Sequence, residues 1–219
     1  RRRDIMANHT ATHLLHAALR ESLGEHVKQA GSLVTPDRLR FDFSHFKAVP
    51  WDILKQMEAR VNEVVRANVS LIEEETSLDA ALAKGAMALF GEKYGDRVRV
   101  ISIADPRDEK TNFSVELCGG THTKTTGEIG LFKFVEERAV ASGARRVEAL
   151  TGRGALARVQ HDWDILVSAS ERLSVPRDEI LKRIEAMREQ VDALRKETER
   201  LKLVAASSSG GATQDTIRE

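Results

Sequence analysis

The 219-residue sequence has a single cysteine, Cys118, so an intrachain disulfide is impossible and a disulfide-stapled secreted scaffold is excluded. It has no net charge, because 34 Lys and Arg residues balance 34 Asp and Glu residues, so net charge does not argue for nucleic-acid binding. No apolar run approaches the roughly 20 residues that span a bilayer, and no secretory hydrophobic segment follows the N-terminus. These absences favour a cytoplasmic protein with no membrane partner.

A starting methionine is also absent, and residues 207–211 have the Ser- and Gly-rich composition of a flexible linker. We therefore expect a piece of a longer protein, with a further domain after residue 219. Hydrophobic residues make up 41% of the chain, which is enough to build a packed core.

The order of apolar patterns predicts an α+β fold, with a mixed or antiparallel sheet and packed helices. Helical spacing predicts helices over residues 5–23, 50–68 and 77–83. Alternating or short apolar runs predict strands over residues 32–34, 38–43, 69–75, 98–103, 113–117, 131–139 and 146–150. The strict strand–helix alternation of a doubly wound sheet is not seen.

From Pro176 the apolar residues step by four and three, at Ile180, Ile184, Met187, Val191, Leu194, Thr198 and Leu201. This heptad stripe predicts a long C-terminal helix that either pairs with a second copy in a homo-oligomer or folds back on the domain. We expect three parts: a domain over residues 1–160, a helical, coiled-coil-like segment over 161–206, and a linker over 207–219.

Four residues have the composition of a metal site. His9 and His13 lie four apart on the first predicted helix, so both imidazoles share one face. About a hundred residues later, Cys118 and His122 lie on either side of a glycine pair that lets the backbone fold tightly. A histidine pair alone is usually an ordinary surface or core feature, but both halves together predict tetrahedral zinc.

Two other kinds of zinc site are alternative interpretations of this pattern. Zinc proteases place a glutamate directly after the first histidine of such a pair, and here that position is Thr10, which argues against peptide hydrolysis. A purely structural zinc site remains an alternative. Structural sites usually draw paired ligands from loops, whereas here two ligands come from a distant helix, which favours a site at the bottom of a pocket.

Five blocks of the sequence resemble the editing core of alanyl-tRNA synthetases, in the family's order. They are HTATHLLHAALR at residues 9–20, QAGSLV at 29–34, RFDFSH at 40–45, GAMALFGEKYG at 85–95 and ELCGGTH at 116–122. The metal motifs are similar to those of threonyl-tRNA synthetase editing domains and of free-standing alanyl-tRNA editing proteins. The resemblance covers about residues 1–160, and it implies the editing-domain fold shared by threonyl- and alanyl-tRNA synthetases.

The resemblance also implies an activity: hydrolysis of serine or glycine wrongly esterified to alanine tRNA, tRNA(Ala). A second site is needed because a pocket for alanine cannot strongly exclude the smaller glycine or the slightly larger serine. The family places zinc among the four residues of the predicted site. It carries a serine-recognising threonine onto Thr12 and a pocket glutamine onto Gln29.

The mechanism stays open at this point. A water polarised by the metal, or by the substrate's own 3′-terminal hydroxyl, attacks the ester carbonyl, or a closed zinc shell only positions the amino acid. The amides of Gly119 and Gly120 are candidates for binding the developing oxyanion. Arg145 and Arg146 are candidates for phosphate contacts with tRNA. His16 is expected to support a metal ligand or to pack.

Alternative functions follow from what is missing. No aminoacylation core or ATP site is recognisable, so the chain alone is not expected to charge tRNA. A non-catalytic, zinc-stabilised module that binds tRNA and dimerises would have the same metal motifs. A free-standing trans-editing protein is a third hypothesis, against which the missing methionine and the trailing linker argue.

Overall fold

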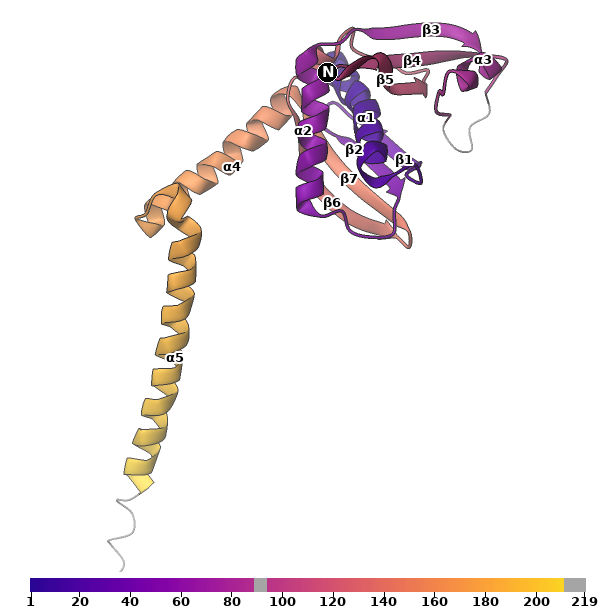
Figure 1. Ribbon diagram of the computed structural model, residues 1–219. Coiled ribbons are helices and arrows are strands. Elements are labelled where there is room, and N and C mark those ends of the chain that lie inside the picture. Colours follow the sequence, from indigo (N-terminus) through magenta and orange to yellow (C-terminus); the bar gives the residue numbers. More distant parts are fainter. Residues whose placement is uncertain (89–93, 211–219) are drawn as a thin grey trace, which may run out of the picture. The chain divides into compact units, whose positions relative to one another are not determined.

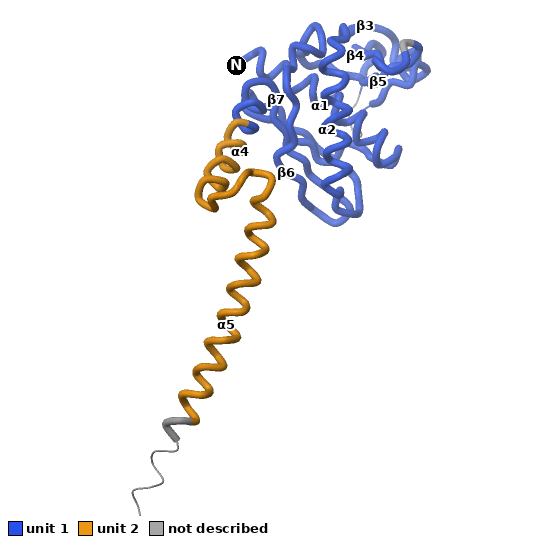
Figure 2. The backbone as a smooth tube through the Cα atoms, turned by 60° about the vertical axis from the view of Figure 1, so that its left-hand side comes forward, with its two compact units in different colours: residues 1–159 blue, residues 160–219 orange. Residues whose placement is uncertain are grey.

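A computed structural model describes residues 1–88 and 94–210 (Figure 1). The chain forms two compact units, Arg1–Val159 and Gln160–Glu219 (Figure 2). The elements are, in order, α1 (Arg2–Leu23), β1 (Gln29–Val34), β2 (Leu39–Ser44), α2 (Trp51–Ala67), β3 (Leu71–Ser77), α3 (Leu78–Ala83), β4 (Arg97–Asp105), β5 (Asp108–Leu117), η1 (Thr126–Ile129), β6 (Phe132–Ala141), β7 (Ala144–Thr151), α4 (Gly152–Leu173), η2 (Arg177–Glu179) and α5 (Ile180–Gly210).

The first unit contains two antiparallel sheets, one with the strand order β1-β2-β7-β6 and one with the order β3-β4-β5. Helices α1 and α2 cover one face of the four-stranded sheet (Figure 1). On β2, Leu39, Phe41 and Phe43 are buried and the residues between them are not, as the alternating pattern predicts. The predicted α+β class is confirmed.

Helix α1 is the centre of this unit, because most of its residues between Ala7 and Leu19 are buried. It ends where the sequence predicts, at Gly24, which takes φ 109° and donates its N–H to the Arg20 carbonyl at 2.9 Å. Polar side chains on so buried a helix need specific partners. His13 and His16 of α1 are therefore held in place by buried surroundings, whereas His9 is only partly buried.

The three-stranded sheet joins the main core through Ile103 of β4 and Phe113 of β5. Buried Arg60 of α2 reinforces this junction. Its guanidinium donates to Glu21 of α1 at 3.0 Å and to Asp105 of β4, and it lies 4.4 Å from the ring centroid of Phe113. Strands β4 and β5, the second of which leads to the other half of the predicted metal site, are thereby linked to α1 and α2.

Two boundaries differ from expectation. Helix α4 begins at Gly152, before the helical segment expected from residue 161, and α5 continues to Gly210, past the expected start of the linker at Ser207. The extension has a simple cause, because alanine is the best helix former, serine costs only a fraction of a kcal/mol, and an existing helix propagates at little cost. Residues 89–93, within one family block, and 211–219 lie outside the described residues.

The second unit contains the predicted long helix, α5, and its heptad stripe is largely exposed. The exposed apolar side chains on α5 include Ile184, Met187, Val191, Leu194 and Leu201. Pairing of this stripe with a second copy stays a prediction. In the part of the chain that the structure describes, no helix combines the length and apolarity needed to cross a membrane.

Candidate metal centre and the adjoining cavity

The four predicted metal ligands come together between α1 and the segment that follows β5. One ligand atom from each of His9, His13, Cys118 and His122 lies within 4.8 Å of the others. The Sγ atom of Cys118 is 3.5 Å from Nε2 of His9 and 3.3 Å from Nε2 of His122. Two segments more than a hundred residues apart thus build one group that could hold a metal ion.

Two of the imidazoles are oriented through their Nδ1 atoms. Nδ1 of His9 lies 3.2 Å from the carbonyl oxygen of Thr121, and Nδ1 of His122 lies 3.3 Å from the hydroxyl of Thr10. The Thr10 oxygen also accepts the Thr123 N–H at 3.1 Å, so Thr10 is itself fixed. These contacts leave both Nε2 atoms facing the sulfur. In metal sites, a histidine ligand is usually oriented in this way, by a hydrogen bond at the ring nitrogen that does not bind the metal.

The third imidazole is anchored by Glu116, a buried residue of β5. The Nδ1 atoms of His13 and His16 lie 2.5 and 3.0 Å from separate oxygens of this carboxylate. Burial alone would raise the pKa of Glu116, but the two imidazoles hold it well below its usual range. Nε2 of His13 is buried and has no hydrogen-bond partner among the described residues. Binding of a metal ion by this nitrogen would explain the missing partner.

The same surroundings ionise the thiol. Burial disfavours the thiolate, yet the neighbouring imidazoles of His122, His13 and His9 outweigh burial and lower the pKa of Cys118 to about 3. The thiolate is the form of cysteine that binds metals. The site therefore presents an anionic sulfur and imidazole nitrogens, which suits a divalent cation.

The ligand segment after β5 is held by Arg99 of β4. Its Nε donates to the Cys118 carbonyl at 2.7 Å, and its guanidinium also donates to the Gly120 carbonyl. The backbone carbonyl of Arg99 accepts the Cys118 N–H at 3.0 Å. Arg99 was not predicted as a site residue, since nothing in the sequence distinguishes it from other basic residues of alternating strands.

The glycine pair acts differently from expectation. Neither Gly119 nor Gly120 takes a left-handed φ, so the pair does not supply an unusual turn. A Cβ on Gly120 would lie 2.0 Å from Cε1 of His9, whereas a Cβ on Gly119 would meet nothing within 4 Å. Gly120 thus allows His9 to approach the backbone closely, and its N–H donates to Cys118 Sγ at 3.4 Å.

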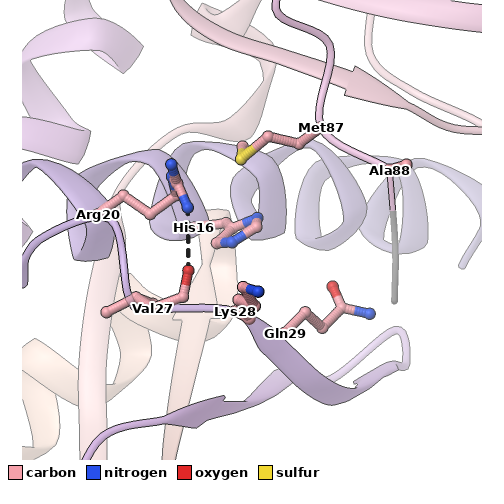
Figure 3. A pocket seen from close by; sticks show the side chains of 7 residues that line it. All are labelled: His16, Arg20, Val27, Lys28, Gln29, Met87 and Ala88. Carbon is pink, nitrogen blue, oxygen red and sulfur yellow. Dashed lines mark hydrogen bonds between the residues drawn. The ribbon is translucent and has the colours of Figure 1, made fainter. Parts of the chain in front are cut away.

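A cavity of about 270 Å³ adjoins the centre on the His16 side (Figure 3). It is lined by His16, Arg20, Val27, Lys28, Gln29, Met87 and Ala88. Its volume is close to the lower limit of about 300 Å³ for small-molecule sites. Gln29 therefore lies at a cavity whose wall is connected, through one carboxylate, to a metal ligand.

Three other candidate residues have partners of their own. The Thr12 hydroxyl donates to the carbonyl one turn earlier in α1, at 2.8 Å, and is buried. Arg145 makes two bonds of 2.6 and 2.7 Å to Glu137, and Arg146 makes two of 2.6 Å to Asp42. The strand register of β2, β6 and β7 creates these pairs, and they leave the phosphate role of both arginines a prediction.

Comparison with known proteins places this site in a family context. Residues 98–148 match the family described as the threonyl and alanyl tRNA synthetase second additional domain. The chain is 52% identical over 206 residues to an alanine–tRNA ligase of Thermoanaerobacter sp. (strain X514), covering 94% of this chain and 23% of that protein. The alanine–tRNA ligases of Pseudomonas syringae pv. syringae and Fervidobacterium nodosum are 52% and 48% identical over 93% and 92% of this chain, and 22% of each relative is covered.

The chain thus spans about a quarter of the length of these relatives. Its similarity to them extends beyond the metal centre to the helices that follow. From these matches, the chain is similar to one segment of alanine–tRNA ligases, and its residues 98–148 match the second additional domain of threonyl and alanyl tRNA synthetases.

Proposed function

We propose that this chain is a zinc-dependent editing hydrolase that removes serine or glycine from mischarged tRNA(Ala). It would act as part of an alanine–tRNA ligase, in the cytoplasm. The observation that carries the proposal is the four-residue centre of imidazoles and thiolate next to the cavity that contains Gln29. The similarity to alanine–tRNA ligases supplies the substrate class.

Zinc fits the spacing of the ligand atoms. With usual bond lengths, a tetrahedral zinc ion separates a sulfur ligand from a nitrogen ligand by about 3.5 Å. The Cys118 sulfur lies 3.5 and 3.3 Å from the Nε2 atoms of His9 and His122. The anchored Nδ1 atoms and the orphan Nε2 of His13 support the same identification.

The residues of the cavity would bind the aminoacyl end of the tRNA. A bound zinc ion would supply Lewis acidity, which polarises a carbonyl or a water. The Gln29 amide offers both a donor and an acceptor for orienting the ester. A cavity of about 270 Å³ suits the amino acid and its ester linkage rather than a stack of nucleotides. The Thr12 hydroxyl donates its hydrogen bond to the Asn8 carbonyl within α1, so toward a substrate it can act only as an acceptor.

One observation favours a second candidate function. Four protein ligands complete a tetrahedral shell, which is typical of structural zinc sites, whereas catalytic sites keep one position for water or substrate. A non-catalytic, zinc-stabilised module that binds tRNA would have such a shell. In the editing proposal, a zinc ion held by all four residues would help to position the substrate, while the residues of the cavity would orient the ester.

The two candidates are separated by measuring deacylation of seryl-tRNA(Ala) and glycyl-tRNA(Ala) by the zinc-loaded chain. We expect hydrolysis by the wild type, loss of both zinc and hydrolysis in Cys118→Ala, and loss of hydrolysis with zinc retained in Gln29→Ala. Gln190→Ala, an exposed glutamine on α5, is the matched control and should behave as wild type. Intact esters in the presence of the zinc-loaded wild type would refute editing and favour the binding module.

Two proposals on partners remain. If Arg145 and Arg146 bind phosphates, they must exchange their carboxylate partners for tRNA, and alanine substitution should reduce the salt dependence of tRNA affinity. If the exposed stripe of α5 pairs with a second copy, sedimentation should detect a homo-oligomer that Leu194→Glu dissociates.

A further inference from the structure

His16 has one ring nitrogen that the fold leaves without a partner. The side chain is almost fully buried, and its ring packs 5.1 Å from that of Phe41, measured between centroids. Nδ1 lies 3.0 Å from Glu116, but Nε2 has no hydrogen-bond partner among the described residues. A buried polar atom without a partner costs free energy, so it requires an explanation. The ring also lines the cavity that contains Gln29 (Figure 3).

The contacts of Glu116 determine whether Nε2 of His16 donates or accepts a hydrogen bond. Each carboxylate oxygen faces one Nδ1 atom, that of His13 or that of His16. An ionised carboxylate only accepts hydrogen bonds, so both Nδ1 atoms must carry a proton and donate it. In a neutral imidazole, Nε2 then has the lone pair. For His13 that lone pair suits the metal, and for His16 it suits a hydrogen-bond donor on a ligand.

The charges around the cavity indicate which kind of ligand group would donate a hydrogen bond to Nε2 of His16. Arg20 and Lys28 line the same cavity, so it already has two cationic side chains. A neutral hydroxyl adds no positive charge next to these side chains, whereas the ammonium of an aminoacyl group would have to lie away from them. Arg20 is fixed in place, because it donates to the carbonyls of Glu25 and Val27 at 3.0 and 3.1 Å.

We propose that His16 is a substrate-contacting residue, and that its Nε2 accepts a hydrogen bond from a hydroxyl of the ligand in this cavity. The inference rests on the proposed function, since an aminoacyl ester of tRNA offers two such hydroxyls. One is the side-chain hydroxyl of a seryl group, and the other is the free hydroxyl of the terminal ribose. His16 is not a metal ligand in this assignment, and it reaches the metal centre only through Glu116.

Two substitutions test the roles of the two ring nitrogens of His16 separately. His16→Asn keeps an N–H donor at the position of Nδ1, facing Glu116, and has no acceptor at the position of Nε2. His16→Gln does the reverse, because its amide oxygen can reach the position of Nε2 but the donor to Glu116 is lost. A role that is merely structural would be disturbed more by His16→Gln, whereas a ligand contact would be disturbed more by His16→Asn.

The test uses the zinc-loaded 219-residue chain and two non-hydrolysable probes, the amide analogues of seryl- and glycyl-adenosine. For His16→Asn we expect unchanged zinc stoichiometry and about tenfold weaker binding of a probe by calorimetry, the effect of one lost hydrogen bond. For His16→Gln we expect probe affinity close to wild type, with zinc lost more readily to a chelator.

The two probes identify the hydroxyl. Weaker binding of the seryl probe alone assigns the serine hydroxyl, and equal weakening of both probes assigns the ribose hydroxyl. Wild-type affinity of His16→Asn for both probes would overturn the inference, as would failure of the wild type to bind either probe. Probe binding without any ester hydrolysis would instead refute the editing activity and leave the His16 contact standing.

Discussion

The methyl group of a single alanine tests how closely His9 must approach the backbone. In Gly120→Ala the new Cβ would lie 2.0 Å from Cε1 and 2.6 Å from Nδ1 of His9. Carbon atoms in contact prefer a separation of about 3.5 Å, so the ring or the loop has to move by about 1.5 Å. Metal–ligand distances tolerate shifts of only about 0.2 Å. We therefore expect His9 to be lost as a ligand.

The loss of a direct ligand should cost at least as much as the loss of an outer-shell partner, for which 10- to 100-fold is typical. We expect zinc affinity to fall by about 100-fold, or about 2.8 kcal/mol. Competition with a chromogenic chelator measures it. Gly119→Ala is the matched control, because its Cβ meets nothing within 4 Å and neither glycine takes a left-handed φ. Equal zinc affinity of the two variants would refute the reasoning.

Three further predictions concern zinc affinity, stability and pH. Glu116→Gln should weaken zinc binding by about 10- to 100-fold in the same competition assay, because the amide cannot accept from His13 as a carboxylate does. Arg60→Met should lower the free energy of unfolding in urea by about 2 kcal/mol, and an unchanged midpoint would contradict the role of this buried guanidinium. Arg146 lowers the pKa of Asp42, so this pair stabilises the fold above the unfolded carboxyl value of about 3.9, and its contribution is lost as the pH falls through the lower folded value. In Asp42→Asn the free energy of unfolding should therefore fall less steeply with decreasing pH in the acid range than in the wild type. An unchanged pH dependence would count against the pair.

Local patterns predicted much of the first unit. The spacing of His9 and His13 on one helix face and the pairing of Cys118 with His122 were enough to predict that these four side chains come together, because each half is local. Alternation on β2 and the stripe on α2 gave the buried faces for the same reason. Glu116 could also have been found, since it lies two residues before Cys118, and side chains two residues apart in an extended chain point to the same side.

Contacts set by strand register could not be predicted in this way. Arg99 reaches the ligand segment only because β4 pairs with β5, and Arg146 meets Asp42 only because β7 pairs with β2 in one register. A shift of one residue would reverse both side-chain orientations, and composition contains no information on which register is taken. The same holds for Gly120, whose small size matters only because α1 passes close to it.

The wide separation of the ligands along the chain has a consequence for folding. His9 and Cys118 are 109 residues apart, so an ion that binds both closes a loop through most of the first unit. In the chain-entropy treatment of cross-links, closing a loop of a hundred residues stabilises the native state by up to about 4.7 kcal/mol. An ion held at this centre would thus cross-link α1 to the segment that follows the three-stranded sheet. Its removal by a chelator would destabilise a large part of the unit rather than one loop.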